Sequence, residues 1–562
     1  MSCSRRQRPE RNLIEATPVN MRARIADVQR SRFRLMPPML ALVAVVAGGV
    51  MLARFPAAER VVVDGVPLDV MRPAGATPGP GVVVAHGFAG SARLMRQFGD
   101  TLVTRGYTVV LPDLDGHGAS TRDPVDLQHD LDVAVTHLSG LPSVDPARTA
   151  LVGHSMGAAA VTTYAATHPS IAATVAISLP GSNAVTPSRP SRLLMLVGQL
   201  EFPGFHQTVE RALAGAGSDR QAATVPGVEH ISILYAARTH RLTADWLDTT
   251  FGRTPSTPGL PSPLRRLASS GVLLLGLLLG FVPITRALLG RPSTVAGRVV
   301  SVPRNAAAGV DPPSDSTRRA AVGADPLAGP ARTAAVAPGP SASPPRPGAV
   351  MAEPAAELGR AAAVVLELAP IAAVAAGGAV VAAVVAPFLP TARLELGGYA
   401  AGFTAVMGLA ILAYLRRFPS PPGGLRSLLG ALLLIPYAAA TIAVPLHLGF
   451  THAVPAGQRW WLLLLVWLGF AVLAYATGRL AGTFRADLLV AAITVCALTA
   501  ASVAGLASGF LVLVVPLLAA LMVIQAGLSA ALRAVAAPPW LSALTGSVLV
   551  AWPIATTLPT AV

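Results

Sequence analysis

The 562-residue chain contains no lysine and only two cysteines. Cys3 stands in an arginine-rich N-terminal segment and Cys496 inside a long apolar run, so the two cannot plausibly pair. A disulfide framework is therefore excluded, and no Cys/His cluster has the spacing of a zinc site. We predict a protein without a metal or another cofactor.

Charge is also scarce, because charged residues make up 13% of the chain and apolar residues 53%, with a mean hydropathy of +0.58. Such a chain is too hydrophobic for an ordinary soluble protein. The apolar runs lie before Ala53 and after Leu267, whereas residues 60–253 mix polar and apolar residues normally. The composition predicts a soluble domain inserted into a membrane protein.

Nine apolar runs are long enough to cross a bilayer as helices. The first, at 37–54, follows a basic tail at 1–36 and is either an uncleaved anchor, which its flanks favour, or a signal peptide. The second is 267–290, and a Pro/Ala-rich segment, 291–360, is then predicted to be a disordered linker. Seven further spans are expected in 361–562: 362–388, 398–415, 427–449, 460–478, 488–508, 510–532 and 540–560.

The net charge of +15 comes entirely from arginine and is concentrated outside the regular domains. Nine arginines lie in the first 34 residues and eight in 291–360, without the aromatic interleaving of a nucleic-acid surface. Because positive residues stay on the cytoplasmic side, they predict a cytoplasmic N-terminus and linker. The short loops between the spans support this orientation, since most of their arginines lie in loops on the predicted cytoplasmic side. Residues 60–253 are then extracytoplasmic in a multi-pass protein of the cell membrane.

Within 60–253, apolar strands alternate with amphipathic helices. Asp64-Gly65 predicts a hairpin turn in VVVDGVPLDVM. Strands are expected at GVVVAH, YTVVLP, RTALVG, ATVAISL, RLLMLVG and QAATVP, with helices starting near Ser91, Asp126, Ser155, His206 and Ile231. This alternation predicts a mostly parallel sheet covered by helices on both faces.

Four motifs stand at the ends of these strands: His86-Gly87-Phe88; the run from Asp113 to Ser120; Gly153-His154-Ser155-Met156-Gly157; and Gly227-Val-Glu229-His230. In this order they resemble the α/β-hydrolases, most closely the monoglyceride-lipase, lysophospholipase and serine-aminopeptidase branch. The resemblance covers about a third of the chain. The expected fold class is α/β: an α/β-hydrolase-type sheet, inserted between transmembrane helices and followed by an all-α membrane bundle.

The pentapeptide around Ser155 has the form of a nucleophile elbow. A sharp strand-to-helix turn needs small neighbours, which Gly153 and Gly157 supply, and it places the serine hydroxyl at a helix N-terminus. Ser155 is the candidate nucleophile. The N–H of Met156 is one candidate oxyanion donor, and the resemblance implies the N–H of Phe88 as the other. His86 and Gly87, together with His154, are expected to support these turns.

A serine nucleophile needs a histidine base and a carboxylate that orients it. His230 follows the last strand and matches the family's histidine. The family often has an aspartate after the next-to-last strand, where this chain has Glu201 in Gly-Gln-Leu-Glu. Glu201 is therefore the candidate acid, with Asp219 and Glu229 as alternatives.

Between the predicted strands ATVAISL and RLLMLVG there is only Gly181–Ser191, so the helical cap of many relatives is missing and the site should be open. We expect a membrane-anchored serine hydrolase that acts on ester or lipid-like small molecules at the bilayer. A peptidase or an acyltransferase on the same fold remains an alternative. A third possibility is a membrane transport or scaffold protein with a non-catalytic domain. The sequence indicates no nucleic acid as partner and does not identify a protein partner.

Overall fold

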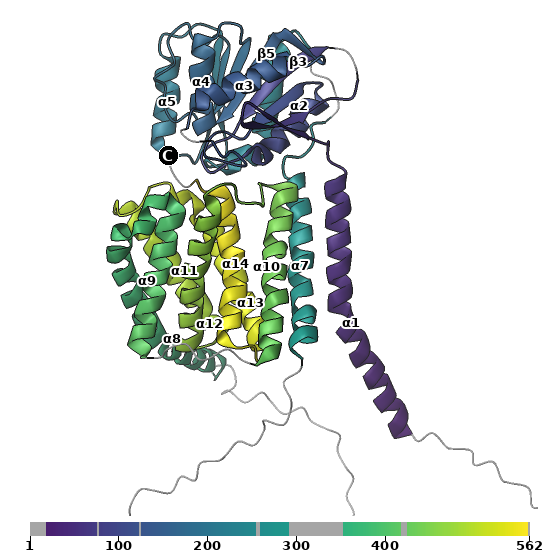
Figure 1. The fold of residues 1–562 in the computed structure, drawn as a ribbon, viewed down its shortest axis with the longest axis vertical. Helices are drawn as coiled ribbons and strands as arrows, with labels where there is room; N and C mark the ends of the chain where they lie inside the picture. Colours follow the sequence, from purple (N-terminus) through teal and green to yellow (C-terminus); the bar gives the residue numbers. More distant parts are fainter. Residues whose placement is uncertain are drawn as a thin grey trace, which may run out of the picture. The chain divides into compact units, whose positions relative to one another are not determined.

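The computed structural model describes residues 18–75, 78–122, 125–254, 259–290, 352–416 and 424–559. It confirms the predicted fold class, with a mostly parallel sheet covered by helices and a region of long apolar helices (Figure 1). The described residues before 291 and after 367 form one compact unit, and residues 352–367 belong to a separate one. Cys3, the first half of the predicted basic tail and residues 291–351 of the predicted linker lie outside the described residues.

The sheet has eight strands in the order β1-β2-β4-β3-β5-β6-β7-β8. β1 pairs with β2 and β2 with β4 in antiparallel fashion, and all later pairs are parallel. The predicted Asp-Gly turn joins β1 to β2, with φ of 46° at Asp64 and 79° at Gly65. The strands are β1 (Glu59–Val63), β2 (Val66–Met71), β3 (Gly79–Ala85), β4 (Thr108–Pro112), β5 (Val144–His154), β6 (Ala173–Ile177), β7 (Leu193–Gly198) and β8 (Arg220–Val225).

Helices cover both faces of this sheet, as the alternation along β3 shows. Val82 and Val84 share one apolar cluster with residues of α2 and α6, whereas Val83 and Ala85 share another with α3 and α4. The helices are η1 (Ala92–Met95), α2 (Arg96–Thr104), α3 (Leu127–Ser139), α4 (Met156–Thr167), α5 (Pro203–Leu213), η2 (Ser232–Tyr235) and α6 (Ala237–Thr250). The helix expected from Ile231 therefore starts as a short 3₁₀ turn, and its α-helical part begins only at Ala237.

Among the described residues, nine helices are long and apolar enough to cross a membrane. One of them, α8, begins at Ala352, inside the segment predicted as linker, where the alanine-rich run AEPAAELGRAAA has high helix propensity. The helices are α1 (Pro18–Ala53), α7 (Arg265–Leu289), α8 (Ala352–Val385), α9 (Glu395–Leu415), α10 (Leu425–Gly449), α11 (Arg459–Leu480), α12 (Phe484–Val503), α13 (Leu511–Arg533) and α14 (Pro539–Thr557); short 3₁₀ turns, η4 (Ala386–Phe388) and η5 (Pro390–Leu394), lie between α8 and α9.

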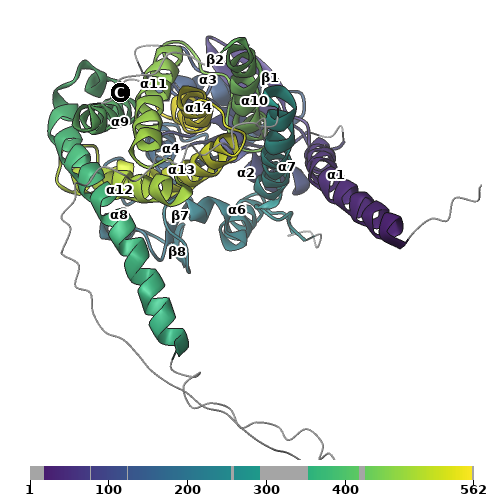
Figure 2. The ribbon, with the colours of Figure 1, turned by 90° about the horizontal axis from the view of Figure 1, so that it is seen from below.

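The helices that flank the α/β domain in sequence, α1 and α7, pack along each other (Figure 2). A Cβ at Gly276 of α7 would lie 2.7 Å from the Val45 nitrogen of α1, so only glycine permits this approach. α7 also packs against α10, and α11 lies between α9 and α14. The α/β domain therefore starts and ends beside one helix pair.

Candidate active site

The predicted elbow is formed where β5 ends and α4 begins. Ser155 lies between them with φ of 51° and ψ of −117°, a conformation that is strained for a residue with a side chain. A Cβ at Gly153 would lie 2.3 Å from the Gly157 oxygen, and a Cβ at Gly157 would lie 2.4 Å from the His86 oxygen. Both glycines are therefore required by the close backbone packing around Ser155.

The structure brings the three predicted catalytic side chains together. The Ser155 Oγ lies 3.0 Å from His230 Nε2, and His230 Nδ1 lies 3.2 Å from Glu201 Oε2. His230 and Glu201 are buried, while Ser155 is half-buried. A histidine whose Nδ1–H donates to the carboxylate leaves Nε2 free to accept the serine proton. The arrangement can therefore activate the Ser155 hydroxyl as a nucleophile.

The second oxygen of Glu201 is fixed by two donors. Its Oε1 accepts hydrogen bonds from Ser178 Oγ at 2.6 Å and from the Gly198 nitrogen at 2.9 Å. Ser178 directly follows β6, is fully buried and has a positive φ of 56°. Sequence reasoning missed Ser178, because its only signal was a serine at the end of an apolar strand.

The two alternative acids lie elsewhere. Glu229 uses both oxygens to accept the N–H groups of Ile231 and Ser232, at 2.8 and 2.7 Å. Asp219 accepts a long hydrogen bond from the Arg192 nitrogen. Of the three carboxylates considered, Glu201 is the one that contacts the ring of His230.

The two candidate oxyanion donors, the N–H groups of Phe88 and Met156, have no competing acceptor among the described residues. Neither the N–H of Phe88 nor that of Met156 donates a hydrogen bond to another residue in the described part of the chain. Met156 opens α4, where backbone N–H groups lack helical partners and the helix dipole favours negative charge. Both groups are thus available to bind an oxyanion.

The remaining motif histidines hold loops in place. His86 donates through Nδ1 to the Gly87 oxygen at 2.8 Å and accepts from the Leu114 nitrogen at 3.1 Å. His154 contacts the His230 oxygen through Nε2 at 2.9 Å, and burial followed by repulsion from His230 lowers the pKa of His154 to about 3. His154 therefore stays neutral at physiological pH and binds the backbone oxygen of His230. It positions His230 and does not act as the base itself.

The acid loop has an apolar surface. Leu200 and Phe202, the neighbours of Glu201, are 63% and 53% exposed, and the Phe205 ring lies 4.8 Å from the ring of His230. The surroundings of the site are therefore suited to apolar substituents.

The described residues contain no group of three or more His, Cys, Asp or Glu side chains arranged to hold a metal ion.

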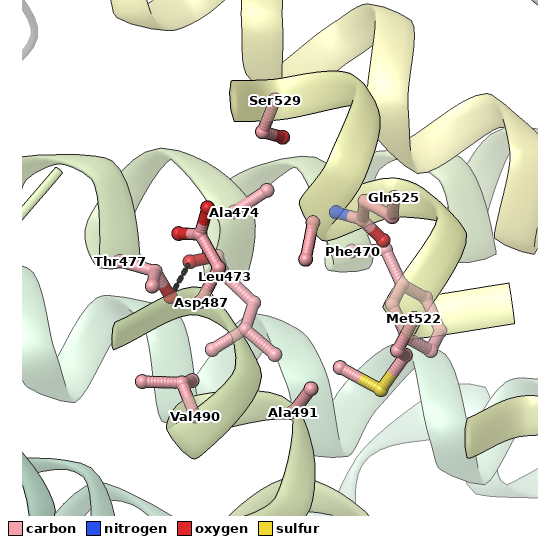
Figure 3. Close-up of a pocket in the computed structure, with 11 residues that line it drawn as sticks. Phe470, Leu473, Ala474, Thr477, Asp487, Val490, Ala491, Met522, Gln525 and Ser529 are labelled. Carbon is pink, nitrogen blue, oxygen red and sulfur yellow. Dashed lines mark hydrogen bonds between the residues drawn. The ribbon is translucent and has the colours of Figure 1, made fainter. Parts of the chain in front are cut away.

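A second polar site lies inside the helical region, between α11, α12 and α13 (Figure 3). Asp487 pairs with Arg533 at 2.6 Å, and Thr477, Gln525 and Ser529 also line the cavity. The Thr477 hydroxyl donates to the Leu473 oxygen of its own helix. The cavity has a volume of about 30 Å³, which is room for one or two water molecules.

Comparison with known proteins places part of the α/β domain in a family. Residues 77–217 match the family described as serine aminopeptidase, S33; the match includes Ser155 and Glu201 but ends before His230. An uncharacterized protein of Mycobacterium tuberculosis (strain H37Rv) is 32% identical over 177 residues, which cover 27% of this chain and 63% of the relative. Epoxide hydrolase A of the same organism is 36% identical over 125 residues, covering 22% of this chain and 38% of that protein.

Solved structures of hydrolases also match about a third of the chain. Est1E from Butyrivibrio proteoclasticus is 14% identical with a TM-score of 0.30, over 35% of this chain and all of that one. A dienelactone hydrolase from Anabaena variabilis is 22% identical with a TM-score of 0.29, over 34% of this chain and 98% of that one. The chain spans about 63% of the length of the uncharacterized relative. The sheet and the family match together show that the chain carries an α/β-hydrolase domain, similar over residues 77–217 to the serine aminopeptidase, S33, family, and joined to a region of long apolar helices.

Proposed function

We propose that residues 59–253 are a serine hydrolase that cleaves carboxylic esters through an acyl-enzyme at Ser155. The observation that carries the proposal is the continuous series of contacts from Ser155 Oγ to His230 Nε2, and from His230 Nδ1 to Glu201 Oε2. This series begins at a strained elbow, and such strain is concentrated at active sites.

In the proposed reaction, His230 Nε2 takes the proton of Ser155 as Oγ attacks the ester carbonyl. The N–H groups of Phe88 and Met156 stabilise the resulting oxyanion; removing one such donor costs about 2.7–4 kcal/mol in similar enzymes. His230 then gives the proton to the leaving alcohol. Water, deprotonated by the same histidine, releases the acid, while Glu201 holds the imidazole in the required tautomer.

A serine nucleophile favours acyl substrates over epoxides. If Ser155 opened an epoxide, the product would be an ether, which water does not readily cleave, whereas an acyl ester is hydrolysed by the same base. The similarity to epoxide hydrolase A therefore supports the fold and not that reaction. The name of the matching family favours amide cleavage as a second candidate.

The nine apolar helices suggest a multi-pass membrane protein, and we propose that the hydrolase domain lies on the extracytoplasmic side. The domain contacts residues 447–459 and Phe510 of the helical region, and both connections are predicted to be on one side of the membrane. Together with the exposed Leu200 and Phe202, this favours esters presented at the membrane surface.

Labelling with a fluorophosphonate probe tests the enzyme proposal. Membranes containing the wild type should be labelled, and Ser155→Ala or His230→Ala should abolish the signal. A folded wild-type protein that stays unlabelled would contradict the proposal. Parallel rates on p-nitrophenyl esters and p-nitroanilides separate esterase from peptidase activity.

Orientation is tested separately by protease shaving of intact cells. Cleavage within residues 60–253 is expected, whereas protection of that domain in intact cells, together with cleavage after lysis, would place it in the cytoplasm.

A further inference from the structure

The turn that follows β3 is joined to the helical region by polar contacts. Ser91 Oγ lies 3.1 Å from Thr451 Oγ1. Arg93 donates to the His447 oxygen at 2.6 Å and to His452 Nδ1 at 3.2 Å. Ser91, Thr451 and His452 are buried, so these contacts are shielded from solvent. The turn that contains Phe88 is thereby fixed to the end of α10 and to the connection that follows it.

The turn after β4 is bound to the same connection. His452 Nε2 lies 2.9 Å from Asp113 Oδ2, and Arg459 donates to the Ser120 oxygen at 3.2 Å. Asp113 is fully buried; burial alone would raise its pKa, but the contact with His452 and the charge of Arg60 outweigh burial and lower it. Two of the four motif turns are therefore held by residues of the helical region.

An apolar contact involves Phe88 itself. The centre of its ring lies 4.8 Å from that of Phe510, in an edge-to-face arrangement. Phe510 is the residue directly before the start of α13. Phe88 and Ala89 pack against the same apolar core as the membrane helices. The next residue, Leu511, lines an apolar cavity of about 40 Å³ between α13, α14 and α9.

We propose that the ends of α10, α11 and α13 take the place of the missing cap, and that Phe510 is a specificity-determining residue for esters with a long hydrocarbon chain. The inference rests on the proposed function. A carbonyl whose oxygen binds the N–H of Phe88 has the Phe88–Phe510 ring pair as its neighbouring apolar wall. A long chain gains contact with this wall and with the start of α13, whereas a short chain does not reach it.

The test uses the full-length protein reconstituted in lipid and compares p-nitrophenyl palmitate with p-nitrophenyl butyrate. For Phe510→Ala, the ratio of kcat/KM for the long ester to that for the short one should fall about tenfold, as expected when apolar contacts to a substrate are lost. Phe510→Trp keeps an aromatic wall and should retain most of the ratio. Phe484→Ala, at the opposite end of the α12–α13 pair, is the matched control and should retain the wild-type ratio.

An unchanged ratio in Phe510→Ala, or an equal change in Phe484→Ala, would overturn the assignment of Phe510. The midpoint of thermal unfolding shows whether each variant is folded. If Phe510→Ala does not fold, Phe510→Leu takes its place, and the same ratio of kcat/KM for the two esters is compared. Fluorophosphonate labelling distinguishes the two proposals. A labelled wild type with an unchanged ratio in the variant removes only the role of Phe510, whereas an unlabelled wild type removes the hydrolase proposal as well.

Discussion

The two carboxylate oxygens of Glu201 have different partners, one facing His230 and the other facing Ser178 and Gly198. Replacing Glu201 by Gln keeps the shape but removes the charge that orients the imidazole and stabilises its protonated form. We expect Glu201→Gln to lower kcat about 10³- to 10⁴-fold with a smaller effect on KM. Steady-state ester hydrolysis measures this, and Asp219→Asn, at a carboxylate that does not contact His230, should keep kcat near the wild-type value.

Ser178 is a positioning residue, because it acts on the reaction through Glu201. Removing its hydroxyl leaves Glu201 Oε1 with one donor fewer, so Ser178→Ala should lower kcat about tenfold. The double variant Ser178→Ala/Glu201→Gln should be no slower than Glu201→Gln alone, since the two side chains act as one unit. Additive losses in this double-mutant cycle would show that Ser178 acts independently of Glu201 and would contradict the positioning role.

At the scale of the elements, α3 is tied to the turn after β4 by one buried carboxyl group. Asp130 accepts the Asp115 N–H at 2.7 Å, and its Oδ1 has no hydrogen-bond partner among the described residues. Burial, together with the charge of Asp115, raises the pKa of Asp130 to about 7. The folded state therefore binds this proton more tightly than the unfolded chain, and stability from this group is lost as pH rises from about 4 to 7.

Asp130→Asn removes this titration while an amide oxygen can still accept the Asp115 N–H. The variant should be more stable than the wild type at pH 8 by about 1–3 kcal/mol, and the difference should shrink toward pH 4. Thermal unfolding of the detergent-solubilised protein across this pH range measures it. A stability difference that does not change with pH would contradict the raised pKa.

The secondary-structure elements and the elbow at Ser155 could be predicted from the sequence, whereas contacts between distant turns could not. Strands and helices were predictable because apolar periodicity is local, and the elbow was predictable because its glycines, the strand before it and the helix after it are adjacent in sequence. The role of Ser178 depends on a positive φ that no local pattern of serine indicates. The contact between Phe88 and Phe510 joins two turns far apart in the chain, and neither turn has a periodicity that would mark its partner.

For the molecule as a whole, Arg93 links the hydrolase domain to the helices. Arg93→Ala removes its hydrogen bonds to the His447 oxygen and His452 Nδ1 and should destabilise the protein by about 1–3 kcal/mol. Arg72→Ala is the matched control, because its ion pair with Glu59 is exposed and should contribute less than about 1 kcal/mol. Thermal unfolding compares the two variants, and equal destabilisation would argue against a role for Arg93 in holding the parts together.

The packing of α1 against α7 has a thermodynamic consequence for the domain inserted between them. While this helix pair stays together, residues 54–264 form a closed loop even when the domain itself unfolds. Closing a loop of this length by a covalent cross-link removes chain entropy worth about 5 kcal/mol from the unfolded state. In a chain with only two cysteines, a helix pair held in a bilayer would thus stabilise the hydrolase domain in the way that a disulfide stabilises a secreted protein.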